Sequence, residues 1–264
     1  MCDNRTVARY DSFEGNPDFV LSLARGLEVI EACQDRPEGV TVGDVAERTG
    51  LSRAAVRRLL ITLEMLGYAV HNGQIYRLGS RVLRLGFSFL SSSSLSTLAL
   101  PILEEITAAI HESSSLSALE GGEIVYLARS TARRVMSVGL AVGSRLPAYC
   151  TSMGRVMLAA LEREEIGAYL ADLELRRHTP KSIVKKSALA TELRRVREQG
   201  YSLVDEELEL GLRSLAVPVR ARSGKVVAAM NTGVHAARVT RKQMVEHFLP
   251  VLREGAERLG LALG

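Results

Sequence analysis

The segment from residue 41 to residue 78 constrains the fold more than any other part of the chain. Thr41-Val-Gly-Asp44 has the residue types of a capping box, and Gly50 is suited to end the short helix that begins there. Ser52 is positioned to cap a second helix that runs to about Leu66. Two helices joined by a short turn that contains glycine are typical of a helix-turn-helix motif.

A β-hairpin is predicted directly after the second helix. Two β-type runs within residues 68–78 flank Asn72-Gly73, the strongest short hairpin signal. An amphipathic helix over Phe19–Cys33, with apolar residues at helical spacing, precedes the motif. Together these elements predict a winged helix-turn-helix domain.

Arginine dominates the outer side of the second helix. At about 100° per residue, Val56, Leu59, Leu60, Leu63 and Leu66 share one arc, and the arginines lie opposite. Arginine suits bidentate contacts to guanine edges and phosphate, and a helix fits the major groove. The wing and the residues just after it add two further arginines near the expected phosphates. We therefore predict that double-stranded DNA is bound by Ser52, Arg53, Ala54, Arg57, Arg58, Thr62, Arg77 and Arg81.

The formal net charge of +4 hides an uneven distribution. Residues 1–47 hold four arginines and ten acidic residues, about −6, whereas residues 48–84 hold seven arginines and one acid, about +6. Such a block is either a solvated face or the electrostatic footprint of a polyanion. Its coincidence with the helix-turn-helix and the wing favours the polyanion.

Composition excludes several classes of protein. The 264 residues, 47% hydrophobic and 24% charged, suit two globular domains. Cys2, Cys33 and Cys150 form no C-x-x-C pair, which argues against a disulfide framework or a zinc site and fits a reducing compartment. No run of 18 apolar residues and no signal peptide are found. We expect a cytoplasmic protein without membrane contact, metal or cofactor.

The pattern changes after residue 80. Residues 80–90 have helical spacing, Ser91–Ser94 is a polar hinge, and a further helix around Leu98–Ile110 carries Pro101 in its first turn. Strands are predicted at Ser115–Leu119, Glu123–Ala128, Val135–Val138, Tyr201–Val204, Ser214–Val219 and Val226–Asn231, and helices at Ser152–Leu161, Glu164–Leu170, Leu189–Gln199 and Thr240–Leu259. Two groups of strands around a helical insertion predict a mixed α/β sheet with helices packed against it, so the fold class is α+β.

No catalytic constellation is found in the sequence. H-E-x-x-H, nucleophile-elbow, Walker A and G-x-G-x-x-G patterns are missing, so we predict no enzyme. Cys150 precedes a predicted helix start that would favour a thiolate, yet a lone cysteine there is more often a packed residue. The loop Pro147–Gly154 is either a plain helix cap or a carboxylate cradle built from backbone N–H groups and the hydroxyls of Thr151 and Ser152.

Seven stretches of the chain carry a family resemblance: Ser22–Ile30, Val45–Arg58, Gly67–Val70, Arg81–Ser91, Glu112–Ser115, Pro147–Arg155 and Gly211–Val219. They resemble the IclR family of bacterial transcriptional regulators over nearly the whole chain after about residue 19. Within the family they are most similar to the PcaR/PcaU/PobR subgroup, which regulates aromatic catabolism through the β-ketoadipate pathway.

The resemblance implies a domain organisation. We expect a flexible tail over 1–18, the winged helix-turn-helix domain over 19–79, a linker helix over 80–94, and a GAF-like effector-binding and oligomerisation domain over 95–264. It also implies a homodimer, or a dimer of dimers, on a pseudo-palindromic operator. Leu85, Phe87 and Phe89 suit either that subunit contact or the core of a single chain.

The resemblance also implies an effector pocket for a small carboxylate or aromatic acid. Carried over by motif, the pocket residues are Tyr149, Thr151, Ser152, Met153, Asp205, Ser214 and Asn231. Glu206 is an alternative to Asp205, one register step away. Ser214 and Asn231 are polar and uncharged, which suits hydrogen bonds to hydroxyl or carboxylate groups.

We therefore expect a ligand-responsive DNA-binding transcriptional regulator of an aromatic-compound catabolic operon, which senses a small aromatic acid or a ring-cleavage product. An alternative is an IclR-type regulator of another carbon-source pathway that senses a small aliphatic carboxylate. Two further alternatives are an enzyme or metabolite-binding module whose helical head only dimerises, and an architectural DNA binder without an effector. Activation and repression are equally compatible with the sequence.

Overall fold

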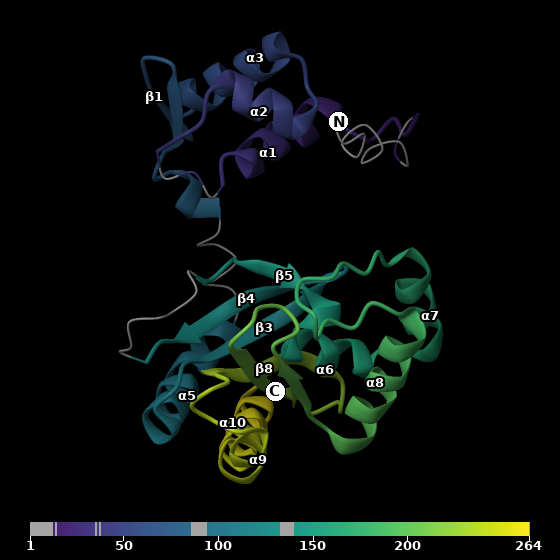
Figure 1. Ribbon diagram of the computed structural model, residues 1–264. Coiled ribbons are helices and arrows are strands. Elements are labelled where there is room, and N and C mark those ends of the chain that lie inside the picture. The colour runs from purple at the N-terminus through teal and green to yellow at the C-terminus, as the bar shows by residue number, and fades with distance from the viewer. Residues whose placement is uncertain are drawn as a thin grey trace. The chain divides into compact units, whose positions relative to one another are not determined.

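The computed structural model describes residues 13, 15–34, 36, 38–85, 94–132 and 140–263. Its contacts divide the chain into two compact units, residues 1–89 and residues 90–264 (Figure 1).

Three predictions fall wholly or mostly outside the described residues. They concern most of the tail 1–18, the strand Val135–Val138, and the linker helix after residue 85, which holds Phe87 and Phe89. Of the predicted linker 80–94, residues 80–85 and 94 are described; residues 82–85 are helical, and Ser94 begins the next helix.

The first unit is a winged helix-turn-helix, as predicted. Its helices are α1 (Leu21–Ala32), α2 (Val42–Thr49) and α3 (Arg53–Met65), and its wing consists of β1 (Ala69–Asn72) and β2 (Ile75–Leu78). The two strands pair antiparallel through the tight turn that contains Gly73, whose φ is +66°.

Local caps define the ends of the two motif helices. The Thr41 hydroxyl accepts a hydrogen bond from the Asp44 N–H at 3.2 Å, and the Thr41 N–H donates to the Asp44 carboxylate at 2.7 Å. Gly50 ends α2 with a φ of +68°, a left-handed conformation that glycine adopts without strain. Ser52 caps α3 by accepting from the Ala55 N–H at 3.3 Å. The turn between the helices is therefore specified by a few neighbouring residues.

The core of this unit joins the helices to the wing. Val45, Val56 and Leu60 are fully buried, and Tyr76 of β2 packs with them. One expectation is wrong: Leu66, placed on the buried arc of the second helix, is 52% exposed. Leu66 stands at the edge of that arc, at the C-cap where α3 ends.

The second unit is built on a six-stranded antiparallel sheet with the order β5-β4-β3-β8-β7-β6. The strands are β3 (Ser114–Glu120), β4 (Glu123–Ser130), β5 (Arg145–Pro147), β6 (Ser202–Asp205), β7 (Leu212–Arg220) and β8 (Val226–His235). Five of them match predicted strands. The edge strand β5 was not predicted, because three residues are too few to show an alternating pattern.

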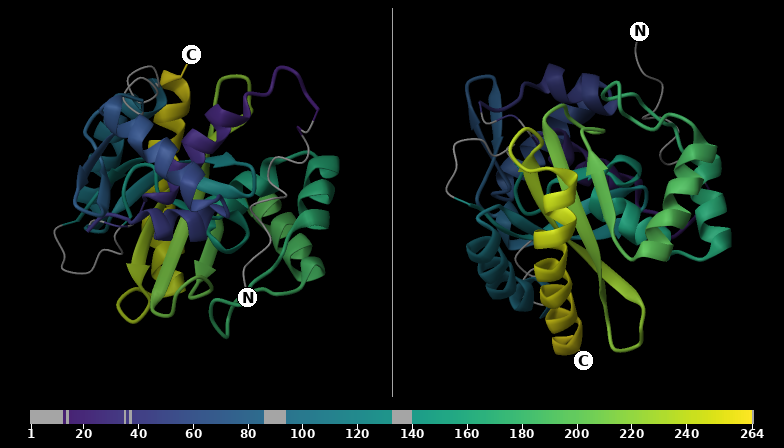
Figure 2. Two further views of the ribbon diagram at one scale, coloured as in Figure 1. Left: turned by 90° about the horizontal axis from the view of Figure 1, so that it is seen from above. Right: turned by 60° about the horizontal axis from the view of Figure 1, so that its bottom comes forward.

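Helices cover both faces of this sheet (Figures 1 and 2). One face packs against α5 (Ser94–Ile110) and α10 (Leu249–Ala262), and the other against α6 (Ser152–Ala160) and α8 (Lys186–Gln199), with α7 (Arg163–Asp172) nearby. The side chains of β7 alternate accordingly: Leu215 and Val217 join the first core, and Ala216 joins the second.

Two helical expectations need correction. Pro101 lies well inside α5 rather than in its first turn, because the helix already begins at Ser94. The single helix predicted from residue 240 is α9 (Arg241–Gln243), a π-helical segment (Met244–Phe248) and then α10. Pro250 has no N–H to continue the α-helical ladder, and the wider π turn before it accommodates the proline.

Candidate functional sites: an arginine-rich helix and a polar cavity

The outer side of α3 presents exposed positive charge. Arg53, Arg57 and Arg58 are exposed, and none of them forms an ion pair with a described residue. Ser52, Ala54 and Thr62 are exposed on the same helix. The side chains between the arginines are small, so a polyanion can approach the helix closely.

The remaining arginines of the basic block, residues 48–84, are not equivalent. Arg77 is exposed on β2, opposite Val70 in the wing. Arg81, by contrast, donates to the Leu66 carbonyl at 2.9 Å and lies over the Tyr68 ring. Arg48 donates to the carbonyl of Ala32 at 2.7 Å at the end of α1. Arg48 and Arg81 therefore hold the unit together, a role that charge counting along the chain does not reveal.

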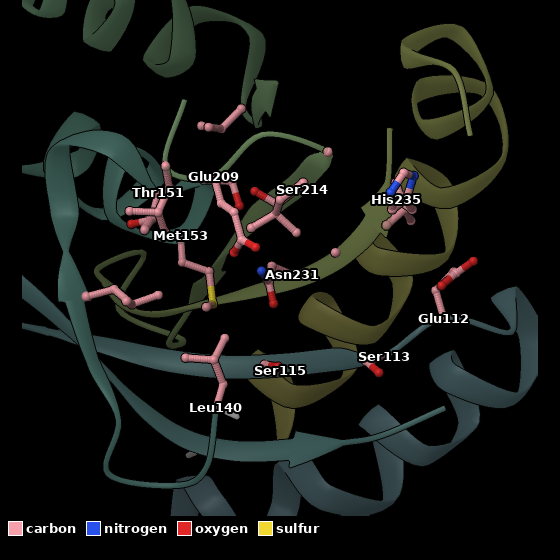
Figure 3. Close-up of a pocket in the computed structure, with 18 of the residues that line it drawn as sticks. Glu112, Ser113, Ser115, Leu140, Thr151, Met153, Glu209, Ser214, Asn231 and His235 are labelled. Carbon is pink, nitrogen blue, oxygen red and sulfur yellow. The ribbon is translucent and has the colours of Figure 1, made fainter. Parts of the chain in front are cut away.

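A cavity of about 830 Å³ opens in the second unit, above strands β3, β4, β7 and β8 and beside the start of α6 (Figure 3). Five predicted pocket residues line it: Thr151, Ser152, Met153, Ser214 and Asn231. Figure 3 shows Asn231 and Ser214 in its centre, with Thr151 and Met153 on one side and His235 and Glu112 on the other. This volume lies in the range of small-molecule sites.

The first turn of α6 forms one wall of the cavity. Thr151 is the N-cap and accepts from the Gly154 N–H at 3.3 Å. The N–H groups of Ser152 and Met153, the next two residues, have no partner within an α-helix. The Ser152 hydroxyl is buried and has no hydrogen-bond partner among the described residues. This wall therefore offers hydrogen-bond donors and the positive end of a helix dipole to a carboxylate.

The close packing of this wall on the preceding turn depends on Gly154. A Cβ at this position would lie 2.2 Å from the Ala148 carbonyl oxygen, in the 3₁₀ turn Ala148–Cys150 that leads into α6. Only a residue without a side chain lets the helix start pack this closely on the preceding turn.

Tyr149 and Asp205 were expected in the pocket, but the structure places neither among the residues that line the cavity. The Tyr149 hydroxyl is hydrogen-bonded to His178 Nε2 at 2.9 Å and accepts from the Arg176 N–H at 3.2 Å. Asp205 accepts from Arg213 Nε at 2.8 Å. In β6 it is Val204 that lines the cavity, and neighbouring residues of a strand point to opposite faces.

The alternative acid, Glu206, does not line the cavity either. Its φ is +58°, and its carboxylate pairs with Lys181 and accepts from the Gly211 N–H at 2.9 Å. These contacts lower the pKa of Glu206, with the hydrogen bond from Lys181 as the main cause. Glu206 therefore stabilises the loop before β7.

Of the acids that follow β6, it is Glu209 that lines the cavity, and sequence reasoning missed it (Figure 3). Further charged or polar groups were missed as well: Glu112, Ser113, Ser115, Arg129, His235 and Arg238. Arg238 donates to Glu112 at 2.8 Å, so these two charges compensate each other. Only Glu112, Ser113 and Ser115 lie in a stretch that carried the family resemblance. The others come from strand ends and loops whose direction depends on the sheet.

Cys150 is a packed residue rather than a reactive thiolate. Burial raises the pKa of its thiol to about 12, because the charged form would lose its hydration. The thiol is therefore protonated at neutral pH. Among the residues that the structure describes, no group of three His, Cys, Asp or Glu side chains could hold a metal ion.

No helix in the described parts of the chain is long and apolar enough to span a bilayer.

A winged helix-turn-helix with exposed arginines on α3, together with a sheet domain that holds a ligand-sized cavity, defines a ligand-responsive DNA-binding regulator. Residues 22–73 match the IclR helix-turn-helix domain, and residues 87–260 match the C-terminal domain of the bacterial transcriptional regulator IclR. The chain belongs to the IclR family of bacterial transcriptional regulators. This membership confirms the prediction of a transcriptional regulator and not an enzyme.

Individual relatives support this assignment. The chain is 47% identical to the Pca regulon regulatory protein of Pseudomonas putida, over 92% of this chain and 84% of that protein. It is 38% identical to the p-hydroxybenzoate hydroxylase transcriptional activator of Acinetobacter baylyi, over 92% and 91%.

Solved structures agree with the fold. A transcriptional regulator from Rhodococcus sp. RHA1 has a TM-score of 0.81 at 45% identity, covering 92% of this chain and 97% of that chain. An IclR homologue from Microbacterium hydrocarbonoxydans, solved with 4-hydroxybenzoate, has a TM-score of 0.78 at 25% identity, covering 90% and 97%.

Proposed function

We propose that this regulator controls genes of aromatic-acid catabolism and that a hydroxybenzoate-type acid or its ring-cleavage product is the effector. The main support for the effector site is the buried Ser152 hydroxyl, which has no hydrogen-bond partner in the described parts of the chain and lies beside the N-terminal amides of α6 in the cavity. Relatives that regulate the Pca regulon and p-hydroxybenzoate hydroxylase support the pathway, and the homologue solved with 4-hydroxybenzoate supports the ligand class.

The effector carboxylate binds at the start of α6, to Thr151, Ser152 and Met153. Ser214 and Asn231 bond to polar groups elsewhere on the ligand, and Glu209 faces the same space. Tyr149 and Asp205 belong to this site as supports behind its walls.

A titration tests the effector site. Protocatechuate, 4-hydroxybenzoate, β-ketoadipate, catechol and cis,cis-muconate are added to the full chain, and unfolding temperature and heat of binding are measured. A ligand at 100 times its Kd stabilises the folded state by about 2.7 kcal/mol. Ser152→Ala should weaken binding about tenfold, because a charge-assisted hydrogen bond is lost. Ser187→Ala, at an exposed serine of α8, is the matched control.

The outcomes separate the alternatives. A response to aliphatic acids alone would support a regulator of another carbon-source pathway. No response to any compound at millimolar concentration would contradict the effector site and favour an architectural DNA binder.

The operator contacts are made by α3 and the wing. Arg53, Arg57 and Arg58 reach base edges and nearby phosphates from α3, with Ser52, Ala54 and Thr62 beside them, and Arg77 contacts the backbone. Arg81 contributes through its support of the wing and α3. If a double variant of Arg53 and Arg57 still footprints the upstream DNA normally, this recognition helix is wrongly assigned.

The regulator acts as a homodimer, with a dimer of dimers as the larger form. Val20, Leu23 and Leu27 are about half or more exposed and recur at helical spacing along one side of α1. A second copy would cover this stripe and bring two copies of α3 to a pseudo-palindromic operator.

Because the target is chromosomal DNA, we place the protein in the cytoplasm. The proposed domain boundaries are 19–79 for the winged helix-turn-helix domain, 80–94 for the linker helix and 95–264 for the effector-binding and oligomerisation domain.

A further inference from the structure

We propose, on the basis of the effector site proposed above, that Arg155 and Glu207 are positioning residues that hold the two main walls of the cavity in register. One wall is the first turn of α6, and the other is the segment 208–212, which leads from β6 into the first residue of β7. The pair joins them without lining the cavity itself.

Arg155 lies one turn after Thr151, in a helix whose residues 152–159 are all buried. Its side chain is 1% exposed. Nη1 and Nη2 donate to the two carboxylate oxygens of Glu207 at 2.7 and 2.6 Å, and Nε donates to the Tyr149 carbonyl at 2.8 Å. The guanidinium therefore connects α6, the turn that precedes it and Glu207.

Glu207 stands directly before the residues that form the second wall. Its carboxylate also accepts from the Ile183 N–H at 3.2 Å, and its carbonyl accepts from the Ser182 hydroxyl at 2.7 Å. These two contacts fix the position of Glu207. Its bonds to Arg155 then fix the start of α6 relative to Glu207.

A bidentate ion pair suits this task better than an apolar contact. Burying two charges is costly, and well-packed apolar residues are often no less stabilising in their place. Apolar side chains, however, tolerate sliding and rotation, whereas a planar guanidinium on a carboxylate fixes both direction and distance. Donors aimed at a ligand need such fixed walls.

The chain contains a matched control. Glu192 on α8 also faces Arg155, but at 3.9 Å, and it is bonded to Arg195 at 2.6 and 2.8 Å. Glu192→Gln therefore removes a neighbouring carboxylate that is 15% exposed and leaves the Arg155–Glu207 bonds in place.

Amide hydrogen exchange on the full-length protein without ligand tests the pair first. In Glu207→Gln, exchange should become faster in both walls, residues 149–155 and 206–212, with little change in the strands of the sheet. Glu192→Gln should leave both walls unchanged. Arg155→Lys keeps the charge but loses the two parallel bonds, so it should show the same faster exchange in both walls. It provides the test if Glu207→Gln folds poorly. A uniform change across the domain, or a change in one wall only, would overturn the proposal.

Ligand affinity is the second measurement. Both Glu207→Gln and Arg155→Lys should weaken 4-hydroxybenzoate or protocatechuate, whichever binds the wild type, about tenfold at a temperature where the variants are folded. Unchanged affinity together with lower stability would mean a purely structural pair and refute the positioning role. If neither acid binds the wild type, the proposed effector class fails, and hydrogen exchange alone decides whether the pair aligns the walls.

Discussion

Single arginines of the basic block perform different tasks although they share a charge. Arg57 on α3 and Arg77 on the wing have no partner among the described residues, whereas Arg81 is bonded to the Leu66 carbonyl and stacked on Tyr68. A guanidinium that is bonded to a backbone carbonyl stabilises the fold. Substitution of such an arginine should therefore lower stability as well as DNA affinity, whereas substitution of the others should change DNA binding alone.

Arg57→Ala should relax sequence preference at one operator position and cost about 1–3 kcal/mol of discrimination, because a base-edge contact is lost. Arg77→Ala should weaken operator and random DNA about equally and reduce the salt slope by about one phosphate contact. Fluorescence anisotropy at several salt concentrations measures both. The same effect from both variants would contradict the division into base and backbone contacts.

Arg81→Ala should lower the unfolding temperature of the first unit as well as DNA affinity, because two intrachain contacts are lost. Circular dichroism melting compares it with Arg77→Ala, which loses no bond to a described residue and should leave the unfolding temperature unchanged. Equal melting temperatures for the two variants would show that the Arg81 contacts contribute nothing to stability.

Cys150 should resist alkylation in the native protein. Its pKa of about 12 leaves on the order of one thiolate in ten thousand at pH 8, whereas a free cysteine is about one quarter thiolate. Mass spectrometry after iodoacetamide treatment should show modification of Cys150 only once the chain is unfolded in guanidinium. Rapid modification of the native protein would mean that the thiol is accessible and activated.

At the scale of elements, α6 is the central helix of the second unit. It is buried on all sides, begins at the cavity wall and carries Arg155 in its middle. Its close approach to the 3₁₀ turn Ala148–Cys150 depends on Gly154. Changes at the helix start should therefore affect effector binding and stability together.

Gly154→Ala should destabilise the second unit by about 1–3 kcal/mol or more, because the new Cβ meets a backbone carbonyl that cannot rotate away. Effector affinity should fall as the first turn of α6 shifts. The control, Gly167→Ala on α7, has open space around its Cβ and should stabilise by about 0.5–1 kcal/mol through helix propensity. Urea unfolding of both variants decides, and a neutral Gly154→Ala would refute the close packing.

At the scale of the whole molecule, effector binding to the second unit must change the free energy of operator binding by the first unit for the protein to respond. An effector that changes operator affinity by 5–150-fold corresponds to a coupling of about 1–3 kcal/mol, and the coupling is reciprocal. Effector Kd measured with and without operator DNA should therefore change by the same factor as operator Kd measured with and without effector. Unequal factors would indicate an additional linked equilibrium, such as a change in subunit assembly.

Subunit assembly should depend on α1. Replacing Leu23 and Leu27 together with glutamate should disrupt the dimer and reduce operator affinity, because charges would enter the proposed contact, while effector binding is retained. Leu261→Glu, at a similarly exposed leucine of α10, is the control. Light scattering gives the oligomeric state, and an intact dimer in the double variant would exclude α1 as the contact.

Local chain chemistry determines much of this fold. The Thr41–Asp44 box, Gly50, the Ser52 cap and the Asn72-Gly73 turn act between residues a few positions apart, so the winged helix-turn-helix and the exposed arginines of α3 could be predicted. The start of α6 could be predicted for the same reason, since Thr151, directly before the helix, caps it by accepting from the Gly154 N–H three residues on.

Tertiary structure decided which side chains share the cavity. Val204 instead of Asp205 faces it because β6 pairs with β7 in one register, and a shift of a single residue would reverse that choice. Glu209 enters it from a loop whose neighbour Glu207 is held by Arg155, 52 residues earlier in the chain. Bonds between such distant residues leave no periodic pattern in the sequence, and only the packed sheet and its helices bring them together.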